Sequence, residues 1–88
     1  MQPPVHEIRF GLIKVCVWLN QTKSGDRHNV TAVRLFRNGD VWKESTIFGR
    51  DDLPLVAKAL DQAHTWIFEH IQRERQLANQ EQGPETQS

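Results

Sequence analysis

The stretch VTAVRLFRNGDVWKESTIF, residues 30–48, decides the fold of this chain. It belongs to an alternating run of apolar and polar residues, His28 to Arg37, which is typical of a half-buried β-strand. Asn38 and Gly39 follow, and both tolerate the positive φ angles of a two-residue type I′ turn. Val41 to Phe48 then returns as the second strand of a hairpin.

The residues before this hairpin predict a further strand. Ile8 to Leu19 is rich in β-branched and aromatic residues. Because its even-numbered and its odd-numbered residues are both apolar, we expect one strand that is central or buried on two sides, with a bend or bulge at Gly11. Residues 22–26 form a turn in which Gly25 supplies a positive φ. The sequence therefore predicts a meander of three or four antiparallel strands over residues 7–48.

The segment after the strands has the spacing of an amphipathic helix. Apolar residues recur at intervals of three and four positions, at Leu53, Val56, Leu60, Ala63 and Ile67. Asp51 or Asp52 can cap its N-terminus while Pro54 occupies the first turn. The predicted helix runs from about residue 51 to 75, and Trp18 and Trp66 are expected to seal it to the sheet. The expected fold class is α+β, a meander followed by one C-terminal helix.

Length and composition indicate a single soluble domain. The chain has 88 residues, of which 38% are hydrophobic and 25% charged, and we place the domain at 7–76 between a flexible N-terminus, 1–6, and a disordered tail, 77–88. No run reaches the roughly 18 apolar residues of a membrane span, and the first residues lack the pattern of a signal peptide. A lone cysteine, Cys16, excludes an internal disulfide and suits a cytoplasmic location.

The candidates for catalysis and metal binding have simpler explanations. His64 and His70 lie six positions apart, which places them on different faces of a helix, unlike the i, i+4 pair of a zinc site. Cys16 lies among apolar residues, where a thiol behaves as a small hydrophobe. Asp51 and Asp52 are explained as helix caps, and the glycines are scattered rather than gathered in a phosphate-binding loop. We therefore expect neither an enzyme nor a metal or other cofactor.

The charge distribution points to nucleic acid as a ligand. Residues 7–50 hold eight basic and four acidic side chains, whereas residues 51–88 hold three basic and seven acidic ones. The strands interleave cations with aromatic rings, as proteins that bind single-stranded nucleic acid do. In this hypothesis cations neutralise phosphates while Trp42, expected to be exposed, and Phe36 stack on bases of DNA or RNA. The predicted site comprises Arg9, Lys14, Arg34, Phe36, Arg37, Trp42 and Lys43.

A competing hypothesis rests on apolar surface. One helix covers only one face of a sheet, so apolar residues of the other face would be exposed, which usually marks an interface. We expect that face to carry Ile13, Val15 and Val17, with Val33 and Leu35. We therefore expect a symmetric homodimer that buries this face or pairs edge strands. The alternative function is accordingly that of a protein-interaction or assembly module.

Parts of the sequence resemble known proteins. The resemblance is carried by VWLN (17–20), HNVT (28–31), WKES (42–45) and FGRDDLPLVAKALDQAHTWI (48–67), which look like a family of small uncharacterised bacterial proteins with no established activity. The order of elements is similar to that of the single-stranded-DNA-binding coactivators of the positive cofactor four and Whirly type. That similarity implies a curved sheet that binds single strands and helices that form a dimer contact, although this chain lacks the lysine-rich flanks of those coactivators.

Overall fold

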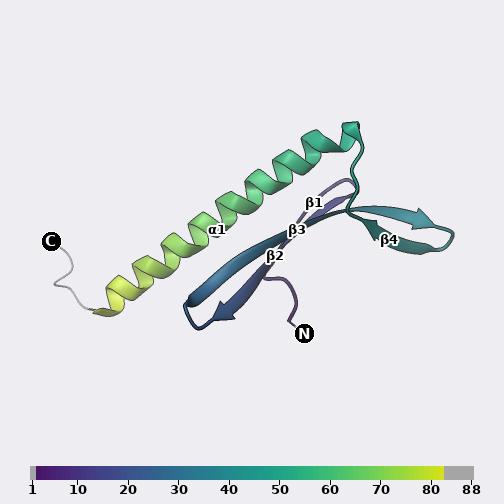
Figure 1. Cartoon of the computed structure of the whole chain (residues 1–88). Helices are drawn as coiled ribbons and strands as arrows, with labels where there is room; N and C mark the ends of the chain where they lie inside the picture. Colours follow the sequence, from purple (N-terminus) through teal and green to yellow (C-terminus); the bar gives the residue numbers. More distant parts are fainter. Residues whose placement is uncertain (1, 83–88) are drawn as a thin grey trace.

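Four strands form one antiparallel sheet in the order β1-β2-β3-β4, and a single long helix follows them (Figure 1). The computed structural model of the chain describes residues 2–82, with side chains to residue 77. The predicted α+β class, a meander followed by one C-terminal helix, is confirmed. The elements are β1 (His6–Phe10), β2 (Ile13–Thr22), β3 (Gly25–Asn38), β4 (Val41–Ser45), the 3-10 helix η1 (Arg50–Asp52) and α1 (Leu53–Gln82).

A tight turn at Gly11 divides the first predicted strand in two. Gly11 has a φ of 60°, and Phe10 pairs with Ile13 across the turn. The prediction of one bent strand over residues 8–19 is therefore wrong. Paired residues of antiparallel strands project to the same face. Phe10 and Ile13 therefore lie on one face, although one has an even and the other an odd residue number. This hairpin explains why both parities of the segment are apolar.

The core lies between α1 and the face of the sheet that it covers. Ile13, Val15 and Val17 of β2 are at most 1% exposed, and they pack with Ile8 and with three helix residues, Val56, Ala59 and Ala63. The expectation that these three β2 residues would lie on the uncovered face is wrong, because the Gly11 turn assigns them to the helix side. Ala59 and Ala63 have short side chains, which let α1 approach the sheet closely.

The hairpin of β3 and β4 projects beyond the start of the helix (Figure 1). Asn38 pairs with Val41, so the two loop residues are Gly39 and Asp40. Only Gly39 has a positive φ, 68°, whereas a type I′ turn needs two such residues. Asn38 therefore stays in the strand, and positive φ at the first central position alone is the pattern of a type II′ turn. β4 ends at Ser45, before the predicted limit of residue 48.

Asp52 organises the passage from sheet to helix. Its Oδ2 atom accepts a hydrogen bond from the backbone N–H of Gly49 at 2.8 Å and lies 3.4 Å from Nε of Arg34. The α-helix starts at Leu53 and continues to Gln82, past the predicted end at residue 75, so the first part of the predicted disordered tail is helical. Residues 83–88 of that tail lie outside the described residues. At the other end, β1 begins at His6, inside the predicted flexible segment.

No helix within residues 2–82 is long and apolar enough to cross a membrane.

Candidate nucleic-acid interface

The sheet face opposite α1, called the open face below, is not covered by any other element of the described chain. The strand pairing aligns Glu7 with Cys16 and Thr31, and Arg37 with Trp42. Since successive side chains of a strand point to opposite faces, every second residue from these aligned positions also lies on the open face. The open face comprises Glu7, Arg9, Lys14, Cys16, Trp18, Asn20, Arg27, Asn29, Thr31, Val33, Leu35, Arg37, Trp42 and Glu44.

An exposed aromatic ring with a cation over it stands at the hairpin end of the open face. Trp42 is 56% exposed, which confirms the prediction that it would be exposed. Arg37 lies directly opposite on β3, and its guanidinium carbon is 5.8 Å from the centroid of the indole. The Nε–H of Arg37 also donates to the carbonyl of Gly39 at 3.2 Å. This arrangement holds a cation at a flat ring that solvent can reach.

A shallow hollow adjoins this pair. Arg9, Leu12, Leu35 and Trp42 line a volume of about 370 Å³, so a second arginine borders the same hollow as this indole. Leu12, in the turn between β1 and β2, is 47% exposed. The hollow thus combines apolar side chains with the cation of Arg9, a combination that suits a flat aromatic group carrying a negative charge.

A second hollow lies nearer the centre of the open face. Its volume is about 260 Å³, and its lining includes Lys14, Cys16, Trp18 and Glu44. Nζ of Lys14 lies 2.7 Å from Oε2 of Glu44, and this hydrogen bond raises the pKa of Lys14 above its ordinary value. The charge of Lys14 is consequently engaged within the protein rather than offered to a ligand.

Cys16 forms the floor of this second hollow. Its side chain is buried, and burial raises the pKa of the Cys16 thiol, with Glu7 and Glu44 adding to the effect and Lys14 opposing it. A thiol with a raised pKa carries its proton at neutral pH and is a poor nucleophile. The arrangement gives Cys16 a packing role.

The two tryptophans that were expected to pack together lie on opposite faces of the sheet. Trp18 is on the open face, where its Nε1–H donates to Oγ1 of Thr31 at 2.9 Å. Trp66, on α1, instead stacks between His6 at 4.7 Å and His70 at 5.0 Å, measured between ring centroids. The prediction of a Trp18–Trp66 pair is therefore wrong, and Trp18 joins the open face as a second indole.

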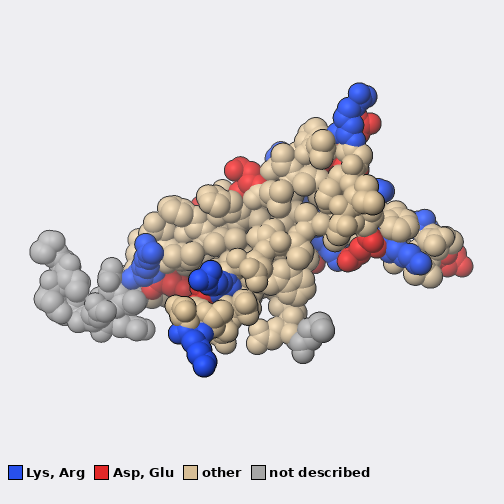
Figure 2. Space-filling model, viewed as in Figure 1, with Lys and Arg blue, Asp and Glu red and all other residues tan. Residues whose placement is uncertain are grey.

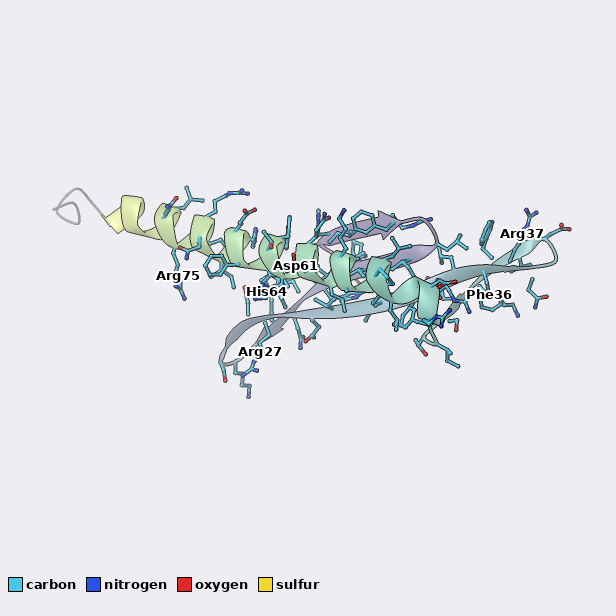
Figure 3. The ribbon with its side chains drawn as sticks, turned by 90° about the horizontal axis from the view of Figure 1, so that it is seen from above. Arg27, Phe36, Arg37, Asp61, His64 and Arg75 are labelled. Carbon is cyan, nitrogen blue, oxygen red and sulfur yellow. The ribbon has the colours of Figure 1, made fainter. Side chains whose placement is uncertain are left out.

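The structure divides the seven residues predicted to bind nucleic acid. Arg9, Lys14, Arg37 and Trp42 lie on the open face. Arg34, Phe36 and Lys43 lie on the other face, because Phe36 pairs with Lys43 and Arg34 pairs with the core residue Ile13. Figure 3 labels Phe36 and Arg37, neighbours in sequence on the projecting hairpin. Arg34 forms an ion pair with Asp52, and Phe36 and Lys43 lie on the same face as Arg34. We therefore exclude all three from the candidate interface.

Sequence reasoning missed Trp18, a member of the open face, and Leu12, which lines the hollow beside Trp42. Both were missed because residues 8–19 were expected to form one strand. A turn placed at Gly11 and Leu12 would have put Ile8 and Phe10 on the same face as Ile13, Val15 and Val17, and would have left Trp18 with Lys14 on the other face. Among residues 2–82 no cluster of three or more His, Cys, Asp and Glu side chains has the geometry of a metal site.

The open face is mildly cationic. It carries the cations Arg9, Lys14, Arg27 and Arg37 and the anions Glu7 and Glu44. The charges of Lys14 and Glu44 cancel in their ion pair. Basic and acidic side chains both appear on the projecting hairpin in Figure 2. The net field therefore comes from a few arginines rather than from a dense basic surface.

Comparison of the chain with protein-family models, with curated proteins and with solved structures finds no match.

Proposed function

We propose that this protein is a non-enzymatic binder of single-stranded nucleic acid and that its open face is the binding surface. The observation that carries the proposal is the Arg37–Trp42 pair, an exposed indole with a guanidinium held 5.8 Å from its centroid. A base can stack on an exposed indole, and each such stack contributes about 1–3 kcal/mol to binding. Arg9, which lines the first hollow, and Arg37, which lies opposite Trp42, would meet the phosphates beside the stacked base.

The exposed indole of Trp42 favours a single strand over a duplex as the ligand. Base stacking needs an unpaired base with a free ring face. The face also contains an ordered second indole, Trp18, towards its middle, so a strand that stacks on Trp42 can continue along the sheet. The order of elements, four antiparallel strands and then a helix, is the feature on which the similarity to the positive cofactor four and Whirly coactivators rests.

The test is a titration of a fluorescently labelled single-stranded oligonucleotide with the full chain, followed by anisotropy at several salt concentrations. Affinity should fall as salt rises, because each phosphate contact releases counterions. With only a few free arginines on the face, the slope should correspond to about two or three phosphate contacts. Trp42→Ala should weaken binding by about tenfold, the lower part of the stacking range.

Matched variants on neighbouring positions make the test specific for the face. Arg37→Gln removes a cation from the open face, whereas Lys43→Gln removes an exposed cation from the opposite face, next to Trp42 in sequence. We expect Arg37→Gln to weaken binding and Lys43→Gln to leave it nearly unchanged. Equal losses in the two variants, or no binding at low salt, would refute the proposal.

The second candidate function is a protein-interaction or assembly module that uses the same open face. It is favoured by the exposed Leu12 beside Leu35 and Trp42, an apolar group that a peptide side chain could cover. Binding of a protein ligand through this group would persist at high salt, where binding to phosphates declines. The salt series therefore separates the two functions.

A further inference from the structure

The outer edge of β3 is free over most of its length. β3 runs from Gly25 to Asn38, yet β4 pairs only with residues 34–38, while β2 pairs with residues 25–34 on the other side. The stretch 25–33 of β3 therefore has a neighbour on one side alone. A long strand edge of this kind presents unpaired N–H and C=O groups to other chains.

The hydrogen-bonding pattern identifies the residues whose backbone points outward. The N–H of Leu35 donates to the carbonyl of Leu12 at 2.7 Å, so odd-numbered residues of β3 direct their backbone groups towards β2. In antiparallel pairs these orientations alternate from residue to residue. The outward N–H and C=O groups consequently belong to Asp26, His28, Val30 and Ala32.

Exposed aliphatic side chains of α1 lie beside this edge, whereas polar side chains predominate beside the opposite edge. Lys58 lies 5.4 Å from the ring centroid of Phe10 on β1, and Gln62, Thr65 and Glu69 line a hollow with β1 residues. The flank of α1 towards β1 is thus largely polar, with Trp66 as the apolar helix residue of this hollow. The opposite flank, turned towards β3 by the helical repeat of 3.6 residues, carries Leu53, Leu60, Ile67 and Ile71.

The flank of α1 towards β3, here the β3 flank, is exposed to solvent. Leu60 is 41% and Ile71 36% exposed, and Val30 on β3 is 38% exposed. Figure 3 shows β3 running along one side of the helix, where His64 and Arg27 are labelled. The surface seen in Figure 2 is mostly uncharged between the two ends of the molecule. A free strand edge and an apolar helix flank therefore adjoin each other.

We infer that this surface binds a second copy of the chain, with the β3 strands of the two copies paired antiparallel about a two-fold axis at Asn29. In this register His28 of one copy faces Val30 of the other, and Asp26 faces Ala32. All four outward-facing residues of each copy then form hydrogen-bonded pairs, whereas an axis at Val30 or His28 leaves part of them unpaired. The result is a continuous eight-stranded sheet.

Two further features favour a second copy over another partner. An isologous interface requires a surface that is complementary to itself, and the axis at Asn29 satisfies the same backbone groups on both strands. Charge complementarity agrees, because Asp26 at one end of the paired segment comes diagonally close to Arg34 of the second copy. Both α1 helices lie on one side of the joined sheet, with their β3 flanks towards the axis and both open faces left free.

Cysteine crosslinking tests the register. At the axis, Asn29 would face its own counterpart in a non-hydrogen-bonded pair with Cα atoms about 4.5 Å apart, within reach of a disulfide. Arg27, also exposed and on the same face, would lie about 13 Å from its counterpart, too far for a disulfide. In a Cys16→Ala background, Asn29→Cys should crosslink on mild oxidation and Arg27→Cys should not. Equal crosslinking of the two variants would overturn the proposal.

Sedimentation equilibrium of the unmodified chain tests whether the dimer forms. Two single substitutions to lysine, one on each strand edge, test which surface forms it. The wild-type chain should show twice the mass of one chain, and a monomer throughout the concentration series would overturn the inference.

Val30→Lys should weaken the dimer by about tenfold or more, because two apolar contacts are lost and two charges are placed at the axis. Val41→Lys, the same change on the β4 edge, should leave the dissociation constant within about twofold of wild type. Circular dichroism verifies that both variants are folded, and equal effects of the two would also refute the assignment.

Discussion

The imidazole of His6 stacks on the indole of Trp66, with ring centroids 4.7 Å apart and ring planes inclined by 4°. His6 begins the edge strand β1, and Trp66 lies in the middle of α1. This contact joins the N-terminal edge of the sheet to the helix at a point where the aliphatic core, centred on Val15 and Ala59, has ended. The stack therefore extends the attachment of α1 along the sheet.

The first prediction concerns this stack. Trp66→Ala should lower the free energy of unfolding by about 3 kcal/mol, as loss of a large, largely buried aromatic side chain does. In a double-mutant cycle with His6→Ala, the coupling between the two rings should be about 1 kcal/mol. Urea unfolding followed by circular dichroism provides the measurement. His64→Ala, an exposed histidine on the same helix, serves as the control and should change stability little; a coupling of zero would show that the rings contribute only independent burial.

The second prediction concerns the turn that separates β1 from β2. Gly11 has a φ of 60°, and a left-handed backbone costs an L-residue about 1–2 kcal/mol. We therefore expect Gly11→Ala to destabilise the protein by about 1 kcal/mol, although the added Cβ would meet nothing within 4 Å. Gly49→Ala is the matched change at a φ of −81° and should be close to neutral. Equal losses at the two glycines would mean that backbone strain does not determine the cost.

The third prediction tests the close approach of helix and sheet. Ala59 is completely buried, so Ala59→Leu should overfill the core and reduce stability by about 1–3 kcal/mol. Ala57→Leu adds the same atoms to an exposed position of the same helix and should leave stability nearly unchanged. Thermal unfolding of the two variants beside wild type decides the point. A neutral Ala59→Leu would show that the contact between α1 and the sheet is loosely packed.

The fourth prediction concerns the reactivity of Cys16. Because burial raises the pKa of this thiol, we expect a thiol reagent such as Ellman's reagent to react slowly with the native protein at neutral pH. The reaction should become fast in denaturant, which exposes the side chain. Rapid labelling of the native chain would contradict the packing role assigned to Cys16.

The fifth prediction is the pH dependence that follows from the same shift. A thiol whose pKa is higher in the folded than in the unfolded state stays protonated longer in the fold, so stability falls as pH rises above the ordinary value of 9.0. Lys14, whose pKa is also raised, loses its stabilising contact with Glu44 only at still higher pH, above 10.5. Cys16→Ala should therefore show a smaller loss of stability than wild type on passing through pH 9.0. Parallel pH curves for the two proteins would contradict this expectation.

Much of the fold could be predicted because its signals are local. The alternation around Val33, the turn at Gly39 and the three- and four-residue spacing of the helix each reside in a few neighbouring residues. The same holds for the exposure of Trp42, which follows a turn on a short edge strand. The errors lay in the boundaries, such as the helix end at residue 82, where a polar composition suggested disorder but the helix continued.

The assignment of residues to faces could not be predicted in the same way. In the segment 8–19 the even-numbered and the odd-numbered residues are both mostly apolar. This pattern is compatible with one strand buried on two sides or with two strands sharing one core. The assignment of Trp18 to the core followed from this ambiguity. The predicted site also combined residues of both faces, because Arg37 and Trp42 share the open face whereas Arg34 and Phe36 lie on the other.

The amino-acid sequence by itself determined the elements and their order, because strand alternation, turn chemistry and helix period depend on residues close together in the chain. Only the tertiary structure decided which face of the sheet is the core and which is open. That choice depends on the cross-strand pairing of Phe10 with Ile13 and on the helix covering Val15. Such contacts join residues far apart in sequence, and the free energy of burying one face rather than the other appears only when the strands and the helix have come together.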